Sequence, residues 1–400
     1  MATGKRGTII EGGRIMLSFK KGVSSLLIIL FLALVPAAYA SEPDIDVKSA
    51  ILVEAETGQV LYNFNEDLEL PPASITKTMA LLLVMEALEA GEISLEEKVE
   101  ATRLAQSKGG SQIWLQAGEK RTVDELLKAV IIPSANDATV ALAEHVGGSK
   151  DNFVRQMNRR AEELGLENTY FGNATGLPVK DGQDSYSTAE DIAVMSRELI
   201  KYDLVMDYSA SRTARIRNGE YPIYTTNNFI GYFEGADGLK TGWTTQAGYN
   251  LVGTAERNGV RFISVVLGTD SDQARVDETA RLLDYAFRAF NETKLINSGV
   301  KVEQVEVEQG EELEVAAITA TQFSAFIERG TKDKIEQEVR IEKELQAPVQ
   351  EGARVGELVF TQEDQELGRV ELITAEAVER AGILTLLFRW IKNFILGFFN

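Results

Sequence analysis

Residues 49–290 combine strand-like and helix-like patterns of hydrophobic positions. Residues 50–54 and 60–64 are typical of two strands joined by a turn, and the apolar run 260–267 is typical of a third. Residues 78–88 are apolar on almost every side, which indicates a buried helix. The pattern therefore predicts a mixed α/β domain with an antiparallel sheet and a helical cluster.

From Gly299 onward, valines alternate with charged residues, as in strands that have one buried and one exposed face. Residues 301–375 carry 18 acidic and 8 basic side chains and are predicted to form a separate small all-β domain. The apolar positions of this alternation are Val302, Val305, Val307, Leu313, Val315, Val339 and Ile341.

The end of the chain, residues 383–399, is aromatic and cationic. Arg389 and Lys392 interrupt the middle of this short stretch, which favours an amphipathic helix lying at a membrane surface over a membrane span. Both cations would then lie at the lipid headgroups. A helix docked on the protein is the alternative. The expected apolar face consists of Leu384, Leu387, Phe388, Ile391, Phe394, Ile395 and Phe398.

The beginning of the chain has the features of a secretory signal peptide. Lys20-Lys21 precedes the apolar run 26–35, and Ala38-Tyr39-Ala40 follows as a small-x-small cleavage site. The apolar run is short for a membrane span, and Met16 is an alternative start. We therefore expect an exported protein from which residues 1–40 are removed.

The remaining chain is strongly acidic. The first 40 residues hold five basic and one acidic side chain, which leaves 36 basic and 60 acidic groups and a net charge of −24. This charge opposes binding to nucleic acid. The chain has no cysteine, which excludes disulfides and thiol chemistry. Its one histidine, His145, is expected to be structural rather than part of a Ser-His-Asp triad, and no His/Cys cluster suggests a metal site.

The motif Ser74-Ile75-Thr76-Lys77 directly precedes the buried helix, which Gly91 is expected to end. Because Pro71-Pro72 cannot continue an incoming helix, Ser74 is expected at the helix N-terminus, with Lys77 one turn later on the same face. A buried lysine loses its charge readily and can accept the Ser74 proton. The amide groups of the first turn can stabilise an oxyanion. The alternative is a helix cap followed by a surface lysine.

The motif Ser134-Ala135-Asn136 lies in a predicted connection between two helices. Residues 122–125 form a capping box, Pro133 breaks that first helix, and helical spacing resumes at Ala135. Ser134 can pass a proton from Lys77 to a leaving amine, and Asn136 can hold a substrate amide through its donor and its acceptor. An ordinary helix–helix turn is the alternative.

The motif Lys240-Thr241-Gly242 lies near the start of the predicted sheet, whose later strands meet at the hairpin turn Asn258-Gly259. Lys240 offers a cation and Thr241 a hydroxyl to a substrate carboxylate, and Gly242 lets a substrate backbone approach. The alternative is an exposed lysine before a turn glycine. Together, the three motifs supply a nucleophile, a base, a proton relay and a carboxylate clamp, which acyl transfer through a serine ester requires.

These motifs, in this order, resemble those of the low-molecular-mass penicillin-binding proteins that act as serine-type D-alanyl-D-alanine carboxypeptidases. The resemblance spans nearly the whole mature chain. We expect a catalytic domain of the β-lactamase and penicillin-binding-protein type at 41–292, a β-rich domain at 293–375 and a membrane-anchor helix at 376–400. Further local matches are Pro72-Ala73-Ser74, Asn173-x-x-Gly176-Leu177, Tyr186-Ser187-Thr188-Ala189, Asp237-Gly238-x-Lys240-Thr241-Gly242 and Ala247-Gly248-Tyr249.

The resemblance implies roles for individual residues. Ser74 would be acylated, Lys77 would be the base, and the backbone amides of Ser74 and Trp243 would form the oxyanion hole. Arg275 matches a family arginine near the substrate carboxylate. The substrate-binding residues would be Asn136, Lys240, Thr241, Gly242, Trp243 and Arg275. Where many relatives have a basic residue after a Thr-Asn pair, this chain has Asn227-Asn228.

The implied reaction removes the terminal D-alanine from peptidoglycan stem pentapeptides through an acyl-enzyme, without a cofactor and on the extracytoplasmic face of a bacterial membrane. Penicillin would acylate the same serine. A β-lactamase is one alternative, although no Glu-x-x-Leu-Asn segment lies between Asn136 and Lys240. The other alternative is a wall-binding or penicillin-sensing module without turnover. An altered Lys77 or Ser134 would have favoured it, but both residues are present.

Overall fold

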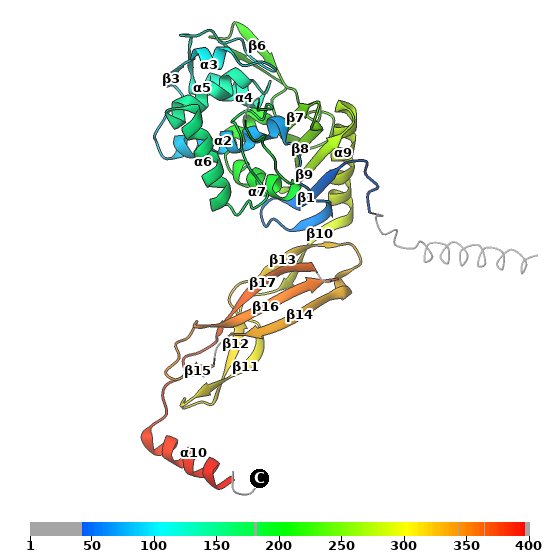
Figure 1. Cartoon of the computed structure of the whole chain (residues 1–400). Coiled ribbons are helices and arrows are strands. Elements are labelled where there is room, and N and C mark those ends of the chain that lie inside the picture. Colours follow the sequence, from blue (N-terminus) through cyan, green and yellow to red (C-terminus); the bar gives the residue numbers. More distant parts are fainter. Residues whose placement is uncertain (1–41, 180–181, 343, 364, 397–400) are drawn as a thin grey trace, which may run out of the picture. The chain divides into compact units, whose positions relative to one another are not determined.

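The computed structural model describes residues 42–179, 182–342, 344–363 and 365–396 (Figure 1). The predicted signal peptide and its cleavage site lie outside these residues. The described chain contains an α/β domain followed by a β-rich domain and a terminal helix, which confirms the predicted fold class.

The α/β domain is built on a five-stranded antiparallel sheet of order β2-β1-β9-β8-β7. The predicted N-terminal hairpin is confirmed, and it joins the sheet beside the last strand. The motif Lys240-Thr241-Gly242 lies on β7, at the edge of the sheet. The strands are β1 (Ser49–Glu54), β2 (Val60–Phe64), β7 (Ala236–Thr244), β8 (Gly248–Arg257) and β9 (Val260–Thr269).

Helices cover both faces of this sheet (Figure 1). Residues that alternate along β9 point to opposite faces. Ile263 and Val265 belong to the core shared with the helical cluster, whereas the ring of Phe262 packs edge-on against Phe287 of α9 at 4.9 Å. Helix α9 (Asp272–Ala289) thus covers one face, and α7 (Ala189–Leu199) connects the other face to the cluster.

Helix α2 (Lys77–Glu89) is the buried helix that the sequence predicts, and α4, α5, α6 and α7 all contact it. Ser74 lies just before it in the 3-10 turn η1 (Ala73–Thr76) rather than in the helix itself. The remaining helices are α3 (Arg103–Gln106), α4 (Val123–Ile131), α5 (Asn136–Gly147), α6 (Lys150–Glu163) and α8 (Asp203–Ser209). Two small two-stranded sheets pair β3 (Lys98–Glu100) with β4 (Lys120–Thr122) and β5 (Thr213–Ile216) with β6 (Tyr221–Tyr224).

The β-rich domain holds a six-stranded sheet of order β14-β16-β17-β12-β11-β15 and a pair formed by β10 and β13. Val305, Val307 and Val315 are buried as predicted. Leu313 and Ile341 are exposed, because Leu313 lies in the turn before β12 and Ile341 ends the edge strand β14. The elements are β10 (Phe290–Ile296), β11 (Lys301–Glu308), β12 (Glu314–Thr319), β13 (Phe323–Glu328), η2 (Lys332–Lys334), β14 (Ile335–Ile341), β15 (Leu345–Gln346), β16 (Arg354–Gln362) and β17 (Gln365–Thr374).

The terminal helix α10 (Ile383–Leu396) is confirmed as a helix. Leu386 is half-buried, but the other large apolar side chains from Ile383 to Ile391 are between 42% and 84% exposed. Arg389 donates hydrogen bonds to the carbonyls of Gly310 (2.6 Å) and Glu311 (2.8 Å), so this guanidinium binds the β-rich domain. None of the described helices is both long enough and apolar enough to cross a bilayer.

Candidate active site

Ser74 and Lys77 lie one turn apart where η1 leads into α2. The Nζ atom of Lys77 is 2.8 Å from the Oγ atom of Ser74 and 3.3 Å from that of Ser134. Ala73, directly before Ser74, has a φ of 49°, a backbone conformation that side chains other than glycine rarely adopt. The nucleophile candidate is therefore presented from a strained turn.

Lys77 is fully buried, with 0% of its surface exposed. Burial lowers the pKa of its amine well below the ordinary value, and the charge of Lys240 lowers that pKa further, while Asp137 opposes the shift. A neutral amine accepts a hydrogen bond, so the Ser74 hydroxyl can donate its proton to Lys77. A hydroxyl beside a neutral amine is the arrangement of an activated nucleophile.

Ser134 lies between the two lysines. It occupies the connection from α4 to α5 with a φ of 62°, and its Oγ accepts a hydrogen bond from Lys240 Nζ at 2.8 Å. The capping box that predicts the start of α4 is present, since Thr122 Oγ1 accepts from the amide of Glu125 at 3.1 Å. Ser134 thus links Lys77 and Lys240 in one hydrogen-bonded row.

Asn136 is the first residue of α5 and is buried at the side of the cleft. Its Nδ2 donates to the carbonyl of Gly109 at 2.8 Å, whereas its Oδ1 has no partner within the described chain. This acceptor is thus a buried, unpaired atom at the side of the cleft, while one hydrogen of the donor already binds the protein. Next to it, the carboxylate of Asp137 accepts from the amides of Ile113 and Leu115 and fixes the loop that follows Gly109.

Lys240 is 2% exposed, so the alternative of a surface lysine is wrong. It donates to Thr241 O at 3.1 Å as well as to Ser134. Burial, and after it the charge of Arg275, lowers the pKa of Lys240 to about 7. Thr241 Oγ1 lies 2.9 Å from Thr226 Oγ1.

Packing within the protein also requires a glycine at position 242, in addition to the expected approach of a substrate backbone. A Cβ atom at this position would lie 2.7 Å from the carbonyl oxygen of Pro72, closer than such atoms come in proteins. The edge strand β7 therefore contacts the turn that carries Ser74 directly, which sets the distance between the two halves of the site. Trp243 follows with an exposed ring tilted against Tyr249 at 5.8 Å.

Arg275 reaches the same strand from the first turn of α9. Its guanidinium donates to the carbonyls of Gly242 (3.2 Å) and Asn250 (3.1 Å) and pairs with Asp272. Burial lowers its pKa. Asn228 donates a hydrogen bond from its Nδ2 to Asp272 at 2.6 Å. The uncharged side chain of Asn228 therefore binds the same carboxylate, that of Asp272, with which Arg275 pairs.

A cleft of about 600 Å³ opens above these residues. Lys77 and Lys240 lie beneath its floor, and no carboxylate is among its described lining side chains. Sequence reasoning missed Gly110, Ser111, Thr226 and Gln246, which belong to no motif. The lining residues are Ser74, Gly110, Ser111, Ser134, Asn136, Leu177, Pro178, Thr226, Thr241, Gly242, Trp243, Thr244, Thr245, Gln246 and Arg275.

His145 lies near the end of α5 and pairs with Glu97 at 3.1 Å, so it does not line the cleft. Among the residues described, no group of three or more His, Cys, Asp or Glu side chains is placed to hold a metal ion.

Comparison with known proteins agrees with this geometry. Residues 37–271 match the family of D-alanyl-D-alanine carboxypeptidases classed as peptidase S11, and residues 290–380 match the C-terminal domain of penicillin-binding protein 5. The chain is 37% identical to D-alanyl-D-alanine carboxypeptidase DacF of Bacillus subtilis, over 93% of this chain and 99% of that protein. It is 34% identical to D-alanyl-D-alanine carboxypeptidase DacC of Escherichia coli, over 91% of this chain and 93% of that protein.

Solved structures give the same result. Penicillin-binding protein 5 of Haemophilus influenzae superposes with a TM-score of 0.73 at 29% identity, covering 85% of this chain and 100% of that one. Penicillin-binding protein D2 of Listeria monocytogenes, in its ampicillin-bound form, has a TM-score of 0.57 at 33% identity. The match covers 62% of this chain and 100% of that one. The resemblance that the motifs indicate is confirmed.

Proposed function

Because the chain belongs to the D-alanyl-D-alanine carboxypeptidase family of serine peptidases, we propose that its cleft removes the terminal D-alanine of peptidoglycan stem peptides through an ester on Ser74. One observation carries the assignment of residues. Ser134 lies between two buried lysines, and the first of them is 2.8 Å from the Ser74 hydroxyl.

In the acylation step, neutral Lys77 takes the Ser74 proton while Oγ bonds to the scissile carbonyl carbon. The oxyanion would be held by the backbone amides of Ser74 and Trp243. When the carbon–nitrogen bond breaks, the proton passes from Lys77 through Ser134 to the leaving nitrogen, and D-alanine departs. Water then attacks the ester and gives its proton back along the same row, which restores the Ser74 hydroxyl.

The substrate would be held on both sides of the scissile bond. Its terminal carboxylate would bind Lys240, the hydroxyl of Thr241 and Arg275, which lie together at β7. The free Oδ1 of Asn136 would accept a substrate N–H. Trp243, exposed beside the cleft, would cover the backbone of the peptide.

Penicillin should acylate Ser74 as a substrate mimic, a proposal that the ampicillin-bound form of the Listeria relative supports. A β-lactamase of class A deacylates with a glutamate and a water molecule, and none of the described residues that line this cleft is acidic. Slow deacylation, and therefore inhibition, is the expected result.

We also propose that the mature protein, with domains at 41–292 and 293–375, is exported and held on the membrane surface by its terminal segment, 376–400. The exposed apolar side chains of α10 support this part, since fully burying each one contributes about 1.5–3 kcal/mol. The binding of Arg389 to the β-rich domain leaves those side chains outside.

The proposal is tested with the purified mature chain, a stem pentapeptide and a labelled penicillin. We expect release of D-alanine, and a covalent penicillin adduct that mass spectrometry assigns to Ser74 and that Ser74→Ala abolishes. An adduct on another residue would overturn the assignment of the nucleophile. Failure to release D-alanine would overturn the proposed reaction.

A further inference from the structure

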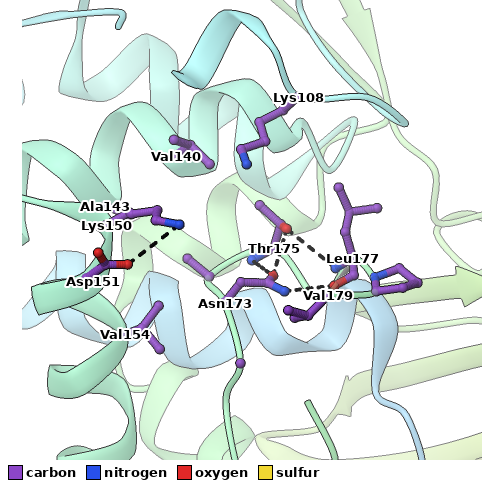
Figure 2. Close-up of a pocket in the computed structure, with 13 residues that line it drawn as sticks. Lys108, Val140, Ala143, Lys150, Asp151, Val154, Asn173, Thr175, Leu177 and Val179 are labelled. Carbon is purple, nitrogen blue, oxygen red and sulfur yellow. Dashed lines mark hydrogen bonds and ion pairs between the residues drawn. The ribbon is translucent and has the colours of Figure 1, made fainter. Parts of the chain in front are cut away.

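A second pocket, of about 330 Å³, adjoins the cleft (Figure 2). Leu177 and Pro178 line both, so they form the boundary between the two. The other walls of the pocket come from α5, from the beginning of α6 and from the loop 172–179. The local match Asn173-x-x-Gly176-Leu177 supplies part of its wall, whereas Lys108 and Lys150 belong to none of the motifs described above.

The wall between pocket and cleft is a fixed structure. Asn173 Oδ1 accepts hydrogen bonds from the amides of Thr175 (2.9 Å) and Gly176 (2.8 Å), and its Nδ2 donates to Leu177 O at 2.7 Å. A Cβ atom on Gly176 would lie 1.8 Å from Ala73 O, so this wall presses against the turn that carries Ser74. The pocket is therefore held at a constant position relative to the nucleophile.

Two lysines point into the pocket (Figure 2). Lys108 is half-buried, and its ammonium group has neither a hydrogen bond nor an ion pair within the described chain. Burial, and after it the charge of Lys150, lowers the pKa of Lys108, while the carboxylate of Glu144 opposes the shift, so the two cations lie within reach of each other's field. Lys150 begins the 14-residue helix α6, and Asp151, exposed at the rim, is 3.6 Å from it.

This arrangement is unusual for an acidic protein. The mature chain has a net charge of −24, so anions are repelled by most of its surface. The half-buried ammonium of Lys108 has no hydrogen-bond or ion-pair partner in the described chain, and Lys150 lies beside it. These two cations make the pocket locally attractive to an anion.

The position of the pocket indicates where that anion comes from. The terminal carboxylate of a substrate is expected at β7, and Gly110, Ser111, Leu177 and Pro178 form the opposite part of the lining. Lys108 precedes Gly110 by two residues in the same loop. A substrate side group that crosses Leu177 and Pro178 therefore enters the pocket.

Resting on the proposed function, we infer that the pocket around Lys108 and Lys150 binds a carboxylate of the stem peptide that lies upstream of the scissile bond. Stem peptides offer two sources of this group: the α-carboxylate of a γ-linked glutamate at the second residue, and a side-chain carboxylate where the third residue is a diamino diacid. Amidation removes the charge in either case. The pocket thus makes the enzyme selective for stems that are not amidated.

The test uses the full mature chain and three pentapeptides: one with both carboxylates free, one amidated at the second residue and one amidated at the third. We expect kcat/KM for D-alanine release to fall about tenfold on amidation of one of these positions, as loss of a charge-assisted contact predicts. That position identifies the source. In Lys108→Met the same substrate preference should disappear, and Lys108→Glu should reverse it.

Two controls separate this subsite from a general loss of activity. Lys108→Met should acylate with labelled penicillin at the rate of the unaltered protein, because a small β-lactam does not extend into the pocket. Lys120→Met, at an exposed lysine on β4, should retain the preference for the carboxylate. Equal kcat/KM values for the three peptides, or a preference that persists in Lys108→Met, would overturn the inference and leave the proposed function intact. An unaltered protein that releases no D-alanine from any of the peptides would overturn both.

Discussion

Lys240→Met should change how the stability of the α/β domain depends on pH. In the folded protein Lys240 has a pKa of about 7, against 10.5 for an exposed lysine, because its ammonium is buried and Arg275 is near. Between these two values the unfolded chain binds a proton at this position and the folded chain does not. The stability of the unaltered protein therefore rises with pH across this window.

The magnitude follows from the width of the window. Each pH unit is worth about 1.4 kcal/mol, so Lys240 contributes an increase of about 4 kcal/mol in the free energy of unfolding from pH 7 to pH 10. Below pH 7 the residue is protonated in both states, and the unfavourable effect of burying its charge is constant at about 5 kcal/mol. Lys240→Met removes this effect but also two hydrogen bonds, each worth about 1–3 kcal/mol when a buried partner is left unsatisfied.

The hydrogen bonds determine whether the variant is more or less stable at pH 7, but they do not titrate. The stability of Lys240→Met relative to the unaltered protein should therefore decrease by about 4 kcal/mol between pH 7 and pH 10. Calorimetric unfolding of both proteins at several pH values measures this difference, and most other titrating groups cancel in it. Lys120→Met, at a position 59% exposed, is the matched control and should show no trend. A difference that is constant with pH, or that moves in favour of the variant as pH rises, would refute the reasoning.

Three further predictions concern activity and location. Lys77→Ala should slow penicillin acylation about 10²–10⁴-fold, measured by stopped-flow quenching, and a loss below tenfold would contradict its role as base. Lys240→Ala should lower kcat/KM for a peptide with a free terminal carboxylate more than for its carboxyl-masked analogue; equal losses would argue against the clamp. Truncation after Glu379 should leave an enzyme that still hydrolyses a small peptide but no longer sediments with anionic liposomes, and continued sedimentation would show that α10 is not the anchor.

The parts of the site that sequence could predict are those encoded by short segments. Ser74 and Lys77 are three residues apart, and the run of apolar residues after them predicts the buried helix that Lys77 begins and that the turn carrying Ser74 precedes. The contact of Ser134 with Lys240 joins residues 106 positions apart, so no local pattern describes it. The order of the three motifs, which resembles a known family, predicts that both residues share one site but not that they form a hydrogen bond.

The remaining features depend on tertiary contacts that have no local signal. Asn228, Asp272 and Arg275 form one polar row, although Asn228 lies more than 40 residues before the other two. The pocket at Lys108 arises because the loop 172–179 packs beside α5 and α6. The burial of Ile341 was misjudged because strand alternation does not reveal which residue ends an edge strand. Likewise, helical spacing does not reveal that Arg389 binds carbonyls of the β-rich domain.

The distribution of charge around the cleft connects folding with function. An acidic chain places two buried lysines and a buried arginine around one cleft, with no carboxylate among the described lining residues. Burial lowers the pKa of Lys77, which favours the neutral form that a base requires. Burial also brings Lys240 to a pKa of about 7, where a nearby negative charge favours its protonation. Under the proposed function, a substrate carboxylate would supply Lys240 with a charged partner. Its binding would then relieve the unfavourable electrostatics of these buried cations.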